Sequence, residues 1–181
     1  MIHPQRIEPQ PGQESVWDYP RPPRLERSPK EVKIIFNETI IATSSNTYRV
    51  LETSHPPVYY IPPDDIKMEY LQPVASGRSF CEWKGVAGYY NLSVKDKSVN
   101  STPPLLEGAC VHFVKNAAWY YPQPTEAFIP IKDYLAFYPS KMDACYLDGE
   151  PVKAQAGDFY GGWITSDIVG PFKGEAGSWG W

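Results

Sequence analysis

The sequence predicts one mainly β domain, and three observations lead to this fold class. Twenty of the 181 residues are proline, against a usual share of about 5%, and an internal proline removes a helical hydrogen bond and clashes with the preceding turn. Aromatic residues make up 14% of the chain. Runs of β-branched and aromatic residues alternate with short polar turns, which is typical of hairpins.

Two of the expected hairpins have clear turn signals. Asn37-Glu38 separates two β-branched runs, and Asp148-Gly149 separates two further runs; Asp-Gly suits a turn that needs positive φ. Pro151 cannot donate to a ladder, so its strand should be an edge strand or carry a bulge. The strands are expected over 32–36, 39–42, 48–52, 58–61, 79–83, 87–94, 110–114, 144–147 and 150–152. One short helix is expected over 62–71, where acids at the start favour the helix dipole, and a loop is expected over 95–108.

Composition divides the chain into three parts. Residues 1–30 contain seven prolines and form an N-terminal extension, either disordered or held to the domain by Trp17 and Tyr19. Residues 31–153 form the β domain. Residues 154–181 form a C-terminal extension with three of the six tryptophans, which indicates that it packs back on the domain, since a free tail is usually poor in aromatics.

Charge and cysteine usage argue against several classes of function. The net charge is −4 and no basic cluster exceeds two adjacent residues, whereas nucleic-acid backbones require a basic face. No apolar stretch approaches the ~20 residues of a membrane span, and the N-terminus lacks the apolar core of a signal peptide. Cys81, Cys110 and Cys145 are far apart and form no C-x-x-C pair, a usage typical of reduced thiols in a cytoplasmic protein. We expect neither a metal site nor a cofactor, and the oligomeric state stays open.

Four short motifs resemble a known family. They are Leu51-Glu52 followed by the His-Pro-Pro-Val-Tyr-Tyr-Ile-Pro run of 55–62, the Cys-Glu-Trp-Lys-Gly-Val-Ala run of 81–87, the Ala-Trp-Tyr-Tyr-Pro run of 118–122, and Asp148-Gly149-Glu150. Together, over residues 31–153, they are similar to the family catalogued as domain of unknown function 427. The resemblance implies a β-tent-like fold, a pair of small antiparallel sheets leaning against each other. It also implies a likeness in fold to modules that hold a small molecule in an aromatic cage, some with an apical zinc ion, for which this chain lacks cysteine pairs.

That family is sometimes labelled nucleotidyltransferase-like, and the residues do not support the label. Such a site needs spaced carboxylates for two Mg²⁺ ions. Asp64 and Asp65 are adjacent, so on a strand they would point to opposite faces. The start of a short helix explains them better.

Aromatic residues on expected strands, with charged residues between them, form a candidate binding cleft. Aromatic faces stack planar ligands or hold cations, and charged groups at the rim would orient a polar ligand. The alternative is that the aromatics fill a core, and that Glu82 and Lys84 face solvent opposite Trp83. The candidate ligand-binding residues are Arg49, Glu52, Tyr60, Trp83, Lys84, Tyr90, Trp119 and Tyr121.

Three functions remain open. The favoured one is a binding module for an unidentified small molecule that is planar, polar or cationic. The second is an enzyme on a small molecule that uses Glu52 or Cys81, with His55 as base and Glu82 as orienting group. The third is a scaffold that buries an extension against a partner protein. His112 should face solvent between core-facing Val111 and Phe113. The tryptophans expected to hold the extensions to the domain are Trp17, Trp163, Trp179 and Trp181.

Overall fold

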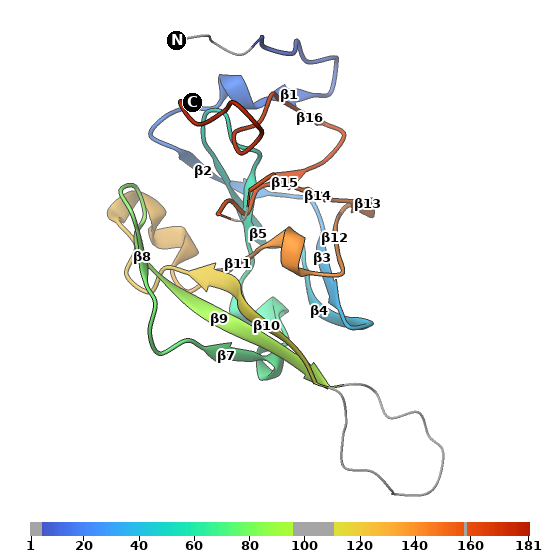
Figure 1. Cartoon of the computed structure of the whole chain (residues 1–181), viewed down its shortest axis with the longest axis vertical. Helices are drawn as coiled ribbons and strands as arrows, with labels where there is room; N and C mark the ends of the chain where they lie inside the picture. Colours follow the sequence, from blue (N-terminus) through green and yellow to red (C-terminus); the bar gives the residue numbers. More distant parts are fainter. Residues whose placement is uncertain (1–4, 96–110, 158) are drawn as a thin grey trace, which may run out of the picture.

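The computed structural model describes residues 5–95, 111–157 and 159–181, and its fold is mainly β (Figure 1). Strands account for 45% of the structure and helical segments for 11%, and no sheet closes into a barrel. One sheet has four strands in the order β13-β12-β3-β4. These strands are Val32–Phe36 (β3), Thr39–Ser44 (β4), Ala144–Leu147 (β12) and Glu150–Pro151 (β13).

The largest sheet has five strands and adjoins a three-stranded sheet. In the larger sheet the order is β11-β10-β9-β7, with β8 also paired to β9, and in the smaller it is β2-β5-β6. A bridge between Ile61 and Leu135 connects the two sheets. The strands are Arg24–Ser28 (β2), Thr47–Leu51 (β5), Val58–Tyr60 (β6), Leu71–Pro73 (β7), Ser79–Cys81 (β8), Gly85–Lys95 (β9), Val111–Tyr120 (β10) and Leu135–Phe137 (β11).

Shorter elements complete the described chain. Glu14–Ser15 (β1) pairs in parallel with Ile168–Val169 (β16), and Lys153–Ala154 (β14) pairs antiparallel with Trp163–Ile164 (β15). The helical segments are 3-10 turns: Val16–Asp18 (η1), Pro63–Asp65 (η2), Met68–Tyr70 (η3), Glu126–Ile131 (η4) and Pro139–Lys141 (η5). The helix expected over 62–71 therefore forms as two successive 3-10 turns, η2 and η3.

The hairpins with the clearest turn signals form as expected. Phe36 pairs with Thr39 across the first turn, and Leu147 pairs with Glu150 across the second. Both turns have positive φ at their two central residues, with 47° at Asp148 and 80° at Gly149. Because β13 is the edge strand of its sheet, the missing donor of Pro151 breaks no central ladder.

The main core lies between the four-stranded and the five-stranded sheets. Alternate residues of β3 are fully buried on one side, and they meet Leu92 of β9 and Phe137 of β11 in one apolar cluster. Trp163 of the C-terminal extension is also in this cluster, is fully buried, and donates from Nε1 to the Phe137 carbonyl at 3.3 Å. The extension therefore contributes to the core of the domain.

Both extensions are ordered in the described residues, but their tryptophans differ in how far they pack against other residues. Within residues 1–30, β2 pairs in register with β5, and β1 lies beside β16 at one end of the molecule (Figure 1). Trp17 packs edge-on against Trp181, with ring centroids 5.5 Å apart. The expectation for Trp179 is wrong, because its side chain is 93% exposed and holds nothing in place.

The outer half of the β9–β10 hairpin differs from the expectation as well. Val111 and Phe113 are 49% and 56% exposed, and His112 between them is also exposed. The alternation expected there fails because the hairpin extends beyond the sheets that would cover one of its faces (Figure 1). Most of the expected 95–108 loop, and Cys110, lie outside the described residues.

A candidate ligand-binding pocket

A cavity of about 670 Å³ opens on the side of the five-stranded sheet that faces away from the main core. Its floor comes from β6, β9 and β10, and its walls come from the β8–β9 turn, the end of β5, and Gln155 and residues 159–161 of the tail. This size and this position at the junction of several elements are typical of small-molecule sites. The lining includes Val50, Glu52, Val58, Tyr60, Cys81, Trp83, Lys84, Tyr89, Trp119, Tyr121 and Tyr138.

Strand alternation decides which aromatic residues reach the pocket. In β6, Tyr59 packs in the main core and Tyr60 on the pocket side. In β10, Ala118 faces the main core and Trp119 the pocket. Trp119 pairs directly with Tyr89 of β9, and directly paired residues share a face. The pocket floor is therefore aromatic because large residues occupy every second position of neighbouring strands.

Trp119 is held by contacts on several sides. The centroid of its ring lies 4.5 Å from the ring centroid of Tyr138, and its Nε1 donates to Tyr60 Oη at 3.3 Å. Gly161 closes the site from the tail, since a Cβ built there would lie 2.2 Å from Trp119 Cη2. Only a glycine allows the tail to approach the indole so closely. The shape of the pocket thus depends on a residue of the C-terminal extension.

Lys84 is the most buried charged residue of the site, with 9% of its surface exposed. Its backbone carbonyl accepts from the Thr125 amide at 3.1 Å, and Thr125 Oγ1 donates to the Trp83 carbonyl. These bonds fix the β8–β9 turn, and Lys84 Nζ lies 5.8 Å from the Tyr121 ring centroid and 5.7 Å from that of Phe128. The turn and the two rings together direct the ammonium inward.

Burial and neighbouring groups shift the pKa of Lys84 in opposite directions. Burial lowers the pKa of its ammonium, whereas the Tyr60 oxygen and the Cys81 sulfur beside it raise that pKa, and the net change is upward. The amine is therefore charged at neutral pH. Burial raises the pKa of Tyr60, although Lys84 and Trp119 partly offset this. Burial also raises the pKa of the Tyr121 hydroxyl, which lies beside Tyr60 and Cys81.

The mouth of the pocket combines an ion pair with exposed aromatic rings. Arg21 Nε lies 3.4 Å from Glu52 Oε1. His55 Nδ1 lies 3.0 Å from the Thr53 carbonyl oxygen, and burial lowers the pKa of this imidazole. Phe80 and Phe159 line the same pocket and are 76% and 78% exposed. The opening is therefore apolar at its surface and charged at its base.

The structure brings together six of the eight residues proposed from the sequence. Glu52, Tyr60, Trp83, Lys84, Trp119 and Tyr121 all line the pocket. The other two lie elsewhere. Tyr90 faces the main core side and packs on Tyr120 with ring centroids 4.9 Å apart. Arg49 points away from the pocket because it alternates with Val50, which lines it.

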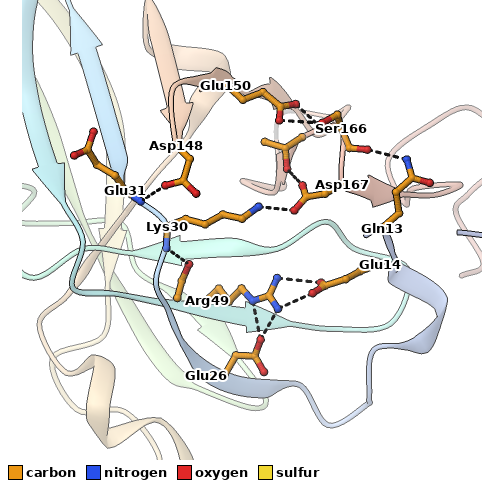
Figure 2. Close-up of polar contacts among 12 residues, drawn as sticks. Gln13, Glu14, Glu26, Lys30, Glu31, Arg49, Asp148, Glu150, Ser166 and Asp167 are labelled. Atoms are coloured by element: carbon orange, nitrogen blue, oxygen red, sulfur yellow. Dashed lines mark hydrogen bonds and ion pairs between the residues drawn. The ribbon is translucent and has the colours of Figure 1, made fainter. Parts of the chain in front are cut away.

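Arg49 belongs to an ion-pair network that holds the N-terminal extension (Figure 2). Its Nη1 and Nη2 donate to the two carboxylate oxygens of Glu14 at 3.0 and 2.9 Å, and its Nε donates to Glu26 at 2.7 Å. Nearby, Lys30 is paired with Asp167 of the tail. Both cations of this region are thus paired with carboxylates of the same chain (Figure 2).

Sequence reasoning missed Tyr89 and Tyr138. Tyr89 Oη and Ser79 Oγ lie 2.6 Å apart. Burial, together with the neighbouring Tyr89, raises the pKa of Tyr138. A signal for Tyr89 existed, because the expected strand 87–94 places residues 89 and 90 on opposite faces. Only the register with β10 shows which of the two shares a face with Trp119.

The described residues contain neither a metal-binding cluster nor a helix that could span a membrane. Within residues 5–95, 111–157 and 159–181, no group of three or more His, Cys, Asp or Glu side chains is placed to hold a metal ion. In the same residues, no helix has both the length and the apolar character needed to cross a membrane.

Comparison with known proteins identifies the family. A family model described as "Domain of unknown function (DUF427)", with the label NTP_transf_9, matches residues 24–148. Because this match covers more than half of the chain, the protein belongs to that family, and the resemblance carried by the four motifs is confirmed. The match begins at β2 and ends in the β12–β13 turn. No curated protein matches the chain.

Proposed function

We propose that this member of the DUF427 family is a binding protein for a small molecule with a planar, apolar body. The observation that carries the proposal is the pocket of about 670 Å³, with an aromatic floor and a few polar groups at its base. Ligand sites in proteins have this composition, mostly apolar with a small number of placed polar groups. The pocket belongs to one cluster of buried aromatics, so its walls form with the fold.

Two buried tyrosines and the Lys84 ammonium come together inside the pocket. Tyr60 and Tyr121 have ring centroids 6.4 Å apart, and both hydroxyls are within the lining beside Lys84. In a solid core, buried hydroxyl and ammonium groups are costly unless fully paired. Their grouping around open volume supports a role in ligand recognition.

An enzymatic use of the same pocket is the second candidate, and it rests on Cys81. This thiol is half-buried, is free, and lines the cavity. Tyr121 and Lys84 are the polar side chains whose charges interact with it, whereas the hydrogen bonds of His55 involve Thr53 and Ser54. The thiol-imidazole pairing considered from the sequence is thus replaced by a thiol beside an ammonium.

The binding proposal is tested with a panel of one- and two-ring aromatic compounds that are neutral, anionic or cationic. Binding is measured by the shift in melting temperature and by the change in tryptophan emission, since Trp83 and Trp119 line the cavity. At least one compound should stabilise the protein in proportion to its concentration. A panel in which nothing changes either signal contradicts the proposal.

A pair of valine variants locates the binding. Val58 lines the pocket, so Val58→Trp should fill the cavity and abolish the shift. Val86 is exposed and lies outside the lining, so Val86→Trp should leave the shift unchanged. Protection of Cys81 from alkylation by the bound compound gives an independent measurement in the unaltered pocket. Equal binding by both variants, with no protection, would place the site elsewhere.

A further inference from the structure

We propose that the pocket selects ligands whose planar body carries a carboxylate, and that the Lys84 ammonium is the group that binds it. This inference rests on the proposed function and specifies the class of ligand. Three features of the described residues support it: a buried cation, the absence of a carboxylate paired with it, and hydroxyl donors next to it.

The cation is buried without an internal counter-charge. Only 9% of the surface of Lys84 is exposed to solvent. None of the ion pairs formed by the described residues includes this lysine. Glu52 is the carboxylate whose charge acts on it, but Glu52 is paired with Arg21 at 3.4 Å. Glu82, two residues before Lys84, is exposed.

Among the described residues, the buried ammonium has no carboxylate of its own, and its contacts within the chain are rings, hydroxyls and a thiol. The rings of Tyr121 and Phe128 lie at 5.8 and 5.7 Å from Nζ, near the outer limit of cation–π attraction. A ligand carboxylate next to Nζ would supply a charge-assisted hydrogen bond, roughly twice as strong as a neutral one. The low local dielectric would strengthen this interaction further.

The neighbouring hydroxyls favour the same ligand group. Tyr60 Oη accepts a hydrogen bond from Trp119 Nε1, which leaves the phenol proton as the group available to a new acceptor. Tyr121 adds a second hydroxyl. An ammonium and two hydroxyls together match a group that only accepts hydrogen bonds, and a carboxylate is such a group.

The charges of the whole lining agree with an anionic ligand and oppose a cationic one. Among the charged lining residues, three are cations and two are carboxylates, which leaves one net positive charge. They are Arg21, Lys84 and Lys173 against Glu52 and Glu82. A cationic ligand on the aromatic floor would lie close to the Lys84 ammonium, and like charges in a low dielectric repel strongly. The sequence predicts a planar, polar or cationic ligand, and the charges of the lining favour a planar anion in place of a cation.

The test uses three probes of the same shape and different charge: 2-naphthoate, 2-naphthamide and 2-naphthylmethylamine. Their affinities are measured by calorimetry for the wild-type chain, Lys84→Met, Lys84→Arg, and Lys153→Met as a control. Lys153 is exposed on β14 and outside the pocket lining. In the wild type, the naphthoate should bind at least about tenfold more tightly than the amide.

In Lys84→Met this preference should disappear, in Lys84→Arg it should be retained in part, and in Lys153→Met it should be unchanged. Equal affinities for naphthoate and amide in the wild type, or an unchanged preference in Lys84→Met, would overturn the inference. If the amide or the amine binds and the naphthoate does not, the inference fails while the binding function stands. If none of the three binds, carboxylate selection is overturned, and the broader panel and the Val58→Trp comparison decide the binding function separately.

Discussion

Two cations of this protein, Lys84 and Arg49, are similarly removed from solvent but differ in their partners. The Arg49 side chain is 14% exposed and donates to two carboxylates, Glu14 and Glu26, through its planar fork. Lys84 is 9% exposed and faces rings, hydroxyls and a thiol around a cavity. The two lie on opposite sides of the small sheet that contains β5.

The difference separates a structural charge from a candidate functional one. A cation neutralised by carboxylates of its own chain gains hydrogen bonds on folding and holds segments together, as Arg49 holds β1 and β2 (Figure 2). A buried cation without a carboxylate partner does not join segments of the chain in this way. Perturbed charges that line a cleft are typical of functional sites, and this criterion selects Lys84 and rejects Arg49.

The largest expected effect comes from removing each cation in turn. Arg49→Met leaves Glu14 without a counter-charge and Glu26 with Arg24 alone. It should reduce the free energy of unfolding by about 2–3 kcal/mol, less than for a fully buried pair because both carboxylates are partly exposed. Lys84→Met replaces an unpaired ammonium by an apolar chain of similar length and should be neutral or stabilising. Urea unfolding of the two variants measures both values.

Arg49→Lys serves as the control, because it keeps the charge and loses the two-pronged contact with Glu14. It should fall between wild type and Arg49→Met. If Lys84→Met were as destabilising as Arg49→Met, Lys84 would have an internal role and the contrast between the two cations would be lost.

A medium effect is expected from the tail residue that shapes the pocket. In Gly161→Ala the new methyl group would lie 2.2 Å from Trp119 Cη2, so the indole must move, at a cost of about 1–3 kcal/mol. Tryptophan emission and the affinity for any ligand found should both change. Gly180→Ala is the matched control, since a Cβ there meets no atom within 4 Å. A silent Gly161→Ala would show that the pocket wall is adaptable.

The smallest expected effects are changes of stability with pH, and they differ between the ion-pair network of Arg49 and the pocket mouth. Although burial opposes it, the hydrogen bonds from Arg49 and Tyr19 hold the pKa of Glu14 below its ordinary 4.5. The stabilisation from Glu14 is therefore present above pH 4.5 and is lost as the pH falls through its folded-state pKa. Arg49→Met should weaken this acid dependence, and the hydrogen bond from Tyr19 retains part of it.

The titration of His55, at the pocket mouth, affects the stability of the fold at a higher pH than the titration of Glu14. Burial holds its pKa below the ordinary 6.5, against opposing contributions from the Thr53 carbonyl and Glu52, and Lys173 and Arg21 lower it further. The unfolded chain therefore takes up a proton first, and stability falls as the pH drops below 6.5 towards the folded-state pKa. His55→Gln should remove this slope, which we expect to be less than about 1 kcal/mol per pH unit. Melting temperatures between pH 3.5 and 8 measure both effects, and identical profiles for wild type and variant would contradict the assignment.

Much of the fold was predictable because its signals are local. Asn37-Glu38 and Asp148-Gly149 specify two-residue turns, and the flanking residues alternate as the strands require. The register between distant strands has no such signal. The sequence shows that Tyr89 and Tyr90 face opposite sides of their strand, but not which of them faces the cavity. Only the pairing of Trp119 with Tyr89 across the five-stranded sheet places Tyr89 there.

The sequence by itself determined the β character of this protein, its tight turns and its family. These follow from the conformational limits of proline, from β-branched and aromatic runs, and from the motifs between residues 51 and 150. The tertiary structure alone decided which charged groups meet. The side chains of Arg49, Glu14 and Glu26 converge across two strand pairings, whereas Lys84 is turned into a cavity by Thr125. Pairing and burial depend on contacts between distant segments, and those contacts make one cation structural and the other a candidate for binding.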